Sequence, residues 1–151
     1  MNKYLNKQTI VKDISLSLLA EGKTIRIKAH GYSMYPCIKP GSLLLIEPIQ
    51  LKKAPVPGEI IAIRRENGLV VHRLSKIVIK NGIRFYIARG DSNSRFDNPV
   101  KITEIAGRIV RAETTGENPV IADIRINTRP NYISNRFRVI GLHIMMKVRR
   151  L

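Results

Sequence analysis

The sequence of 151 residues has a single cysteine, Cys37, three histidines and no tryptophan. One thiol excludes an internal disulfide, and so few thiols and imidazoles argue against a structural metal centre, so we expect no metal and no cofactor. The chain also lacks the roughly 20 consecutive apolar residues that a membrane-spanning helix needs. With 44% hydrophobic residues it can still bury a core. We therefore expect one folded domain with short appendages.

Acidic residues are scarce. The 11 Asp and Glu residues stand against 27 Lys and Arg, which gives a net charge of +16. This balance favours anionic partners, either nucleic acid or the face of an anionic membrane. Because only five tyrosines and three phenylalanines are available for base stacking, we expect no specific nucleic-acid binding. The charge then serves solubility and weak attraction to an anionic surface.

The N-terminal segment predicts a helix over residues 8–21, with Val11, Ile14 and Leu18 spaced to form an apolar face that packs on a core. The alternative is a signal peptide, because three lysines precede an apolar run at 14–20. That run is short and no A-x-A-like cleavage site follows it, so the helix is the favoured interpretation.

The centre of the chain predicts a β meander. Period-two alternation indicates a strand at 24–30, and the next strand candidates are 42–47, 59–65, 69–80, 83–89 and 105–113. Asn67-Gly68 and Asn81-Gly82 lie between such runs and predict hairpin turns. We predict a mainly β domain of hairpins with an N-terminal helix and, as one option, a short C-terminal helix. The expected parts are 1–28 (helix and lead-in strand), 29–113 (core) and 114–151 (a basic extension on or beside the core).

The tail over residues 136–151 has five basic residues, no acidic one, and apolar residues between them. One interpretation is a basic amphipathic helix that lies on an anionic membrane. The other, which we favour, is a terminal helix or strand that completes the core, because Pro130 and Gly141 should interrupt a long helix.

One short string has the form of a nucleophile turn. Gly31-Tyr32-Ser33-Met34-Tyr35-Pro36 follows a predicted strand, Gly31 permits an unusual φ, and Pro36 stiffens the exit. A nucleophilic serine needs such a constrained turn to project its Oγ. By itself the pattern leaves open a serine that only caps or solvates a turn.

The possible nucleophile turn is the first of five short sequence motifs that follow one another along the chain. They are 31–36 with 40–46, 57–64, 70–74, 90–97 and 105–110. Together they resemble the catalytic domain of the signal peptidase I superfamily, which includes the LexA-type self-cleaving repressors. The resemblance covers residues 29–110, and it makes 29–113 a peptidase core.

The third block indicates a branch of this superfamily. His72 precedes Arg73 where bacterial-type signal peptidases carry a lysine, so the chain resembles the endoplasmic-reticulum and archaeal type. Under that resemblance Ser33 is the nucleophile, His72 the general base and Asp97 the acid that orients the imidazole. Asp91 of the Gly-Asp turn supports the site, as do Gly31, Met34 and Arg73. Imidazole, with an ordinary pKa of about 6.5, is largely neutral at pH 7 and can accept the serine proton.

Several alternatives stay open for these residues. His30 lies near Ser33 and is a rival base, Cys37 is a small hydrophobe or a thiol near the site, and Asp91 and Asp97 can each hydrogen-bond turn amides. Asp97 is the expected triad acid, and Asp91 is the alternative.

The resemblance implies a serine endopeptidase that removes a leader or signal segment from a precursor bound as an extended strand. About 30 residues precede Ser33, so we expect neither a membrane anchor nor a DNA-binding domain there. The expected location is the cytoplasm or the periphery of a membrane, with an anionic membrane surface or a membrane protein as a further partner. The alternative is a non-enzymatic basic module that binds anionic lipid, nucleic acid or a peptide.

Overall fold

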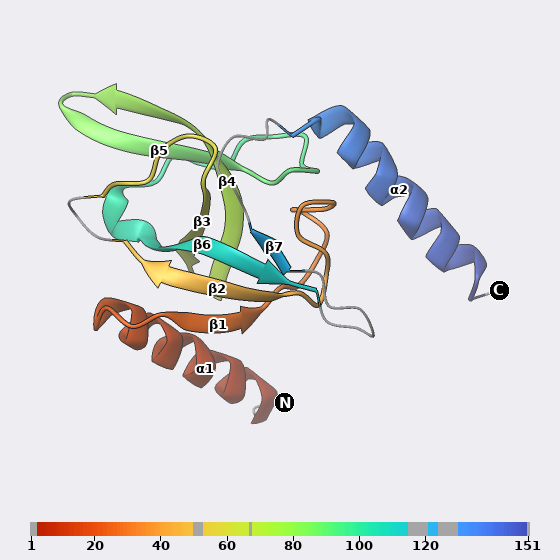
Figure 1. The fold of residues 1–151 in the computed structure, drawn as a ribbon, viewed down its shortest axis with the longest axis horizontal. Helices are drawn as coiled ribbons and strands as arrows, with labels where there is room; N and C mark the ends of the chain where they lie inside the picture. The colour runs from red at the N-terminus through yellow and green to blue at the C-terminus, as the bar shows by residue number, and fades with distance from the viewer. Residues whose placement is uncertain (1–2, 50–52, 67, 115–120, 124–129, 151) are drawn as a thin grey trace.

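An antiparallel sheet forms the centre of the protein (Figure 1). The computed structural model describes residues 3–49, 53–66, 68–114, 121–123 and 130–150. Within these residues the strand order is β1-β2-β6-β3-β4-β5, and a seventh strand, β7, also pairs with β6. The strands are β1 (Ile25–Lys28), β2 (Leu43–Pro48), β3 (Ile60–Arg65), β4 (Gly68–Lys80), β5 (Ile83–Arg89), β6 (Ile105–Glu113) and β7 (Ile121–Asp123). The mainly β prediction is confirmed, with a helix near each end.

The two predicted hairpins are β3–β4 and β4–β5. Asn81 and Gly82 have φ values of 51° and 73°, the left-handed backbone that a type I′ turn requires. At the first hairpin, Arg65 pairs with Gly68, while Asn67 lies outside the described residues. The sequence did not predict β7 or the short 3-10 helix η1 (Ile102–Glu104) that precedes β6.

The core lies on both faces of β3. Ile60 and Ala62 belong to one cluster of buried side chains, which also contains Met34, whereas Ile61 and Ile63 belong to a second. These four of the six residues of β3 are 0–1% exposed. Because neighbouring residues of a strand point to opposite faces, a strand buried on both faces has a continuous apolar run instead of an alternating one.

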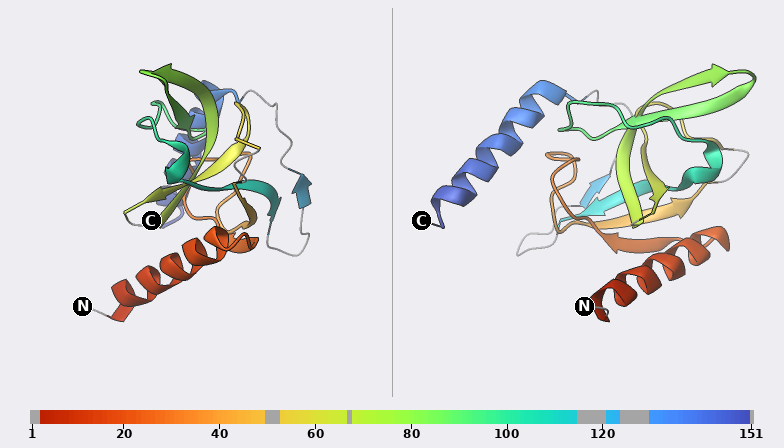
Figure 2. Two further views of the ribbon diagram at one scale, coloured as in Figure 1. Left: turned by 90° about the vertical axis from the view of Figure 1, so that its left-hand side faces the viewer. Right: turned by 180° about the vertical axis from the view of Figure 1, so that it is seen from behind.

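Helix α1 (Lys3–Ala20) lies beside β1 and β2 (Figures 1 and 2). It packs through its C-terminal turns, where Leu19 is buried and Leu16 and Leu18 are partly buried. Ile14 is 55% exposed, so the prediction that it faces the core is wrong. The side chain of Val11 lies outside the described residues. No described helix is both long enough and apolar enough to cross a membrane.

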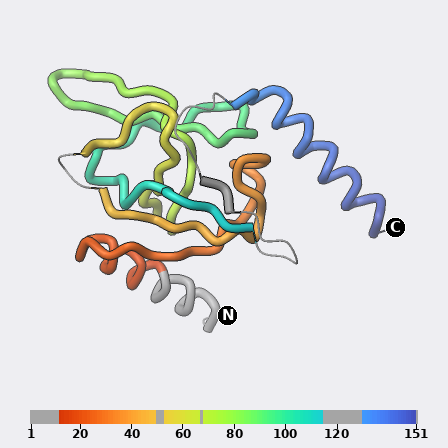
Figure 3. The backbone as a smooth tube through the Cα atoms, in the orientation of Figure 1, coloured from red at the N-terminus to blue at the C-terminus, as the bar shows by residue number. Residues whose placement is uncertain are grey.

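Helix α2 (Tyr132–Val148) projects away from the sheet (Figures 1 and 3). The prediction that this segment completes the core is wrong, because Asn135 is the only buried residue of the helix. Gly141 does not interrupt it, since one exposed glycine costs a helix only about 1 kcal/mol. Asn131 is the N-cap between Pro130 and the helix, and its side-chain oxygen accepts a hydrogen bond from the Ser134 N–H at 3.1 Å.

Candidate active site

The loop that carries Ser33 is held in place by Ser92. The backbone N–H of Ser92 donates to the carbonyl of Ser33 at 2.9 Å, and its hydroxyl donates to the carbonyl of Tyr32 at 2.6 Å. Gly31 enters the turn with a φ of 77°, which L side chains rarely adopt. Two contacts from another loop therefore fix the backbone of a half-buried serine.

Gly90 allows the two loops to approach this closely. A Cβ at this position would lie 2.7 Å from the Ser33 carbonyl oxygen and 2.7 Å from Nδ2 of Asn93. The glycine of the predicted Gly-Asp turn is therefore required by packing against the serine loop, because no side chain fits there.

His72 lies in β4 opposite Ile61 of β3 and is buried. Its Nδ1 lies 2.6 Å from Oδ2 of Asp97. An ionised carboxylate can only accept, so Nδ1 carries the proton and donates to Asp97, which leaves Nε2 as the basic nitrogen. The Asp97 backbone N–H donates to the carbonyl of Ala88 at 2.9 Å, which fixes the aspartate beside the end of β5.

Ser33 and His72 line one pocket of ≈ 430 Å³, together with apolar residues that include Met34, Ile38 and Leu44. No hydrogen bond joins Ser33 Oγ to His72 among the contacts of the described residues. Catalytic hydrogen bonds are often long without substrate and shorten in the substrate complex. The pocket therefore brings together a hydroxyl and a histidine paired with a carboxylate.

The rival base His30 also lines this pocket, but it is exposed. In the described part of the chain it has no ion pair with a carboxylate, unlike His72. A histidine without an acidic partner has nothing to fix its tautomer or to stabilise the imidazolium.

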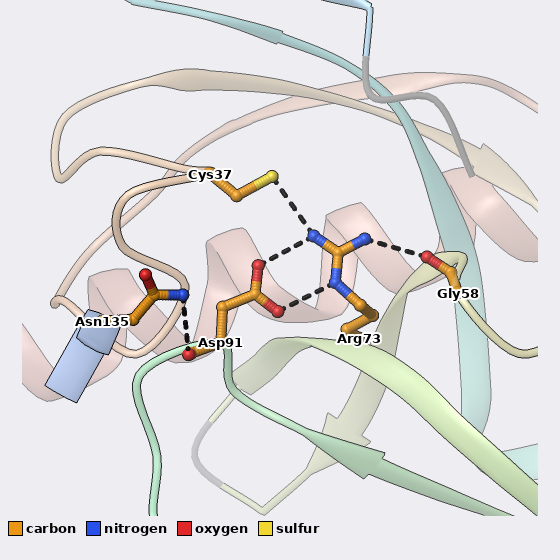
Figure 4. A network of polar contacts seen from close by, with 5 residues as sticks. All are labelled: Cys37, Gly58, Arg73, Asp91 and Asn135. Carbon is orange, nitrogen blue, oxygen red and sulfur yellow. Dashed lines mark hydrogen bonds and ion pairs between the residues drawn. The ribbon is translucent and has the colours of Figure 1, made fainter. Parts of the chain in front are cut away.

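A separate network lies around Arg73 (Figure 4). Its guanidinium donates to both carboxylate oxygens of Asp91 at 2.8 Å, to the carbonyl of Gly58 at 2.9 Å and to Sγ of Cys37 at 3.3 Å. The Arg73 and Asp91 side chains are 3% and 1% exposed. The backbone carbonyl of Asp91 in turn accepts from Nδ2 of Asn135 in α2 at 3.1 Å. This network joins β4, the Cys37 loop and α2.

The network also sets the protonation of its members. Burial raises the pKa of the Cys37 thiol, and the nearby positive charge of Arg73 only partly opposes this. Burial by itself would lower the pKa of Arg73, but the hydrogen bonds and charge of Asp91 outweigh it and raise that pKa. Arg73 is thus charged and Cys37 a neutral thiol at neutral pH.

The two aspartates left open by the sequence have different partners: Asp97 contacts His72, and Asp91 contacts Arg73. Sequence reasoning missed the role of Ser92 in clamping the serine loop and the contact of Asn135 with the Asp91 loop. The position of Ser92 directly after the Gly-Asp pair was the one sequence signal for its role. The sequence contained no signal for Asn135, because it lies in a helix far from the site in sequence.

Two free strand edges border the pocket. In the described part of the chain, β1 pairs only with β2, and residues 68–72 of β4 pair only with β3. Ile27 and Lys28 of β1 and residues 69–72 of β4 line the pocket. An unpaired edge presents backbone N–H and C=O groups that an extended peptide can pair with.

Comparison with family models places this chain in the superfamily of LexA-like and signal-peptidase-like serine peptidases. Residues 3–110 match the family model described as Peptidase S24-like. The match spans well over half of the chain, so the protein belongs to the Peptidase S24-like family. A search of curated proteins finds no match.

Proposed function

We propose that this protein is a serine endopeptidase that removes a leader or signal segment from a precursor polypeptide. Ser33 is the nucleophile, His72 the general base and Asp97 the acid that orients the imidazole. The observation that carries the proposal is the 2.6 Å contact of His72 Nδ1 with Asp97, in a pocket that Ser33 also lines. Because the base is a histidine, the proposal places the chain with the endoplasmic-reticulum and archaeal type of signal peptidase.

In the proposed reaction, Nε2 of His72 takes the proton of Ser33 Oγ as the oxygen attacks the scissile carbonyl. The imidazolium then gives this proton to the leaving amine, and an acyl-enzyme on Ser33 remains. Water, deprotonated by the same nitrogen, hydrolyses the ester and regenerates the serine. Asp97 stays ionised throughout and stabilises the imidazolium across a contact that is mostly shielded from solvent.

The substrate would bind as an extended strand. The free edges of β1 and of residues 68–72 in β4 support main-chain pairing on either side of the pocket. The pocket wall beside Ser33 is apolar, which suits small uncharged side chains just before the scissile bond. Lys28, at the rim, favours acidic residues further along the substrate.

The experiment is cleavage of a library of synthetic peptides, read by mass spectrometry, with wild type, Ser33→Ala and His72→Ala. We expect a shared set of cleavages in wild type that both variants lose. The double variant should be no worse than either single one, because nucleophile and base act as one unit. His30→Ala is the matched control and should retain activity.

Labelling with a fluorophosphonate probe is a second test of whether Ser33 is a nucleophile. The probe should label wild type on Ser33 and leave Ser33→Ala unlabelled. If the wild type neither cleaves peptides nor is labelled by the probe, but still binds peptides, the alternative holds and the chain is a peptide-binding relative without activity. If His72→Ala retains activity within about threefold, the histidine assignment is wrong.

A further inference from the structure

Among the described residues, the contacts of α2 with the rest of the protein come from one side of the helix. At its start, the ring of Tyr132 lies 3.7 Å from the guanidinium carbon of Arg89. Further along, the ring of His143 packs edge-on against Tyr32 with centroids 5.1 Å apart, and the Tyr32 hydroxyl donates to Sδ of Met146 at 3.7 Å. With the buried Asn135 these positions define the inward side of the helix.

The opposite side of α2 carries an apolar stripe. Its members follow one another at intervals of four, three, four and four residues, which at 3.6 residues per turn places them within an arc of about 80°. They are Ile133, Phe137, Ile140, Ile144 and Val148, and they are 72%, 69%, 42%, 59% and 63% exposed. Five large apolar side chains aligned in water along 17 residues form a continuous surface, unlike single exposed apolar residues.

Positive charge surrounds this stripe. Arg136 and Lys147 lie on one side of it, and Arg138 and Arg149 lie on the other, all of them exposed. No aspartate or glutamate occurs anywhere in residues 130–151. An apolar stripe between two rows of cations is the pattern of a helix that lies in the interface of a bilayer.

We propose that α2 is a membrane-binding helix that lies flat on an anionic lipid bilayer, with the apolar stripe in the acyl boundary and the cations among the headgroups. The net charge of +16 adds long-range attraction to such a surface. A second copy of the chain suits the stripe less well, because pairing the two helices would bring their rows of cations together with no acidic residue to neutralise them. The proposal concerns binding and holds whether or not Ser33 is a nucleophile.

Fluorescence tests where the helix sits. The chain has no tryptophan, so Phe137→Trp creates a single reporter in the stripe. Ile79→Trp in β4 is the matched control, because Ile79 is as exposed, at 69%, and lies away from α2. With phosphatidylcholine–phosphatidylglycerol vesicles, we expect the emission of Phe137→Trp to shift to the blue and to be quenched by brominated lipid. Ile79→Trp should show neither change, and pure phosphatidylcholine should have much less effect on either variant.

Vesicle sedimentation measures how much the apolar stripe and the positive charges each contribute to membrane binding. Ile144→Ser should lower the partition coefficient about tenfold by removing buried apolar area, while Ile79→Ser leaves it unchanged. Arg138→Gln should lower it about fivefold and reduce its dependence on salt. All three side chains are exposed, so the melting temperatures should match that of wild type.

Three results would overturn the proposal. If the protein binds anionic vesicles but the emission of Phe137→Trp stays that of an indole in water, net charge alone accounts for binding. If light scattering shows a dimer that Ile144→Ser dissociates, and vesicles do not bind, the stripe is covered by a second copy of the chain. If a partner protein shields the stripe from solvent and no vesicle does, the stripe is covered by that protein.

Discussion

Replacement of Asp97 by asparagine changes one charge in the proposed triad and almost no volume. In the structure Asp97 accepts the Nδ1 proton of His72 at 2.6 Å, and the two side chains are 19% and 9% exposed. Asparagine cannot stabilise an imidazolium by charge, and its NH₂ group favours the tautomer with the proton on Nε2. That tautomer cannot take the proton of Ser33. We expect kcat to fall by about 10³- to 10⁴-fold, with KM changed little.

Asp91→Asn is the matched control, because it makes the same chemical change six residues away in the same loop. Asp91 accepts two hydrogen bonds from Arg73, and both side chains are almost fully buried. Loss of its charge leaves a buried guanidinium without a counterion, which costs about 3 kcal/mol of the free energy of unfolding. For a chain of this size the melting temperature should fall by roughly 6–12 °C. Activity below that temperature should remain near wild type.

The assay is the cleavage rate of one peptide selected from the library, measured beside a thermal melt for each variant. The reasoning is refuted if Asp91→Asn abolishes turnover while Asp97→Asn only lowers the melting temperature. If neither variant changes turnover, the site is a Ser-His dyad and the Asp97 contact is structural.

Three further predictions concern Gly90, Cys37 and the net positive charge. Gly90→Ala should destabilise the protein by about 1–3 kcal/mol and lower kcat, because the new methyl group displaces the Ser33 loop; an unchanged melt would contradict this. Cys37 should react with iodoacetamide more slowly in the folded protein than in the urea-unfolded chain at pH 8, and faster as the pH rises, because its raised pKa keeps the thiol protonated; equal rates would show that burial does not control it. Duplex DNA binding should fall steeply with salt and show no sequence preference, and selective binding at physiological salt would contradict our interpretation of the charge.

Local patterns predicted most of the sheet. The Asn81-Gly82 turn and the strands on either side of it rest on backbone preferences of neighbouring residues, which the sequence contains directly. The β3 strand was also predicted, but only the structure shows that its four consecutive apolar residues lie between two core clusters.

Tertiary partners were harder to predict. Ile14 has the spacing of a core residue, yet among the described side chains of α1 it is Leu19, with Leu16 and Leu18, that packs on the core, so the spacing could not show which residues become buried. The tail contains a good amphipathic pattern, but the pattern does not say whether its apolar face meets the core or solvent. For the site, block order indicated both aspartates, and only the three-dimensional pairing separates Asp97 from Asp91.

The Arg73–Asp91 pair has a consequence for strand register. His72 and Arg73 are consecutive, so they point to opposite faces of β4, and each contacts its own aspartate from the loop after β5. A slip of β4 by one residue against β3 would exchange the two faces. It would move the imidazole toward Asp91, take it away from Asp97 and leave the buried carboxylate without its guanidinium. The ion pair thus fixes the register of β4, because a chain that keeps Arg73 paired with Asp91 also keeps His72 facing Asp97.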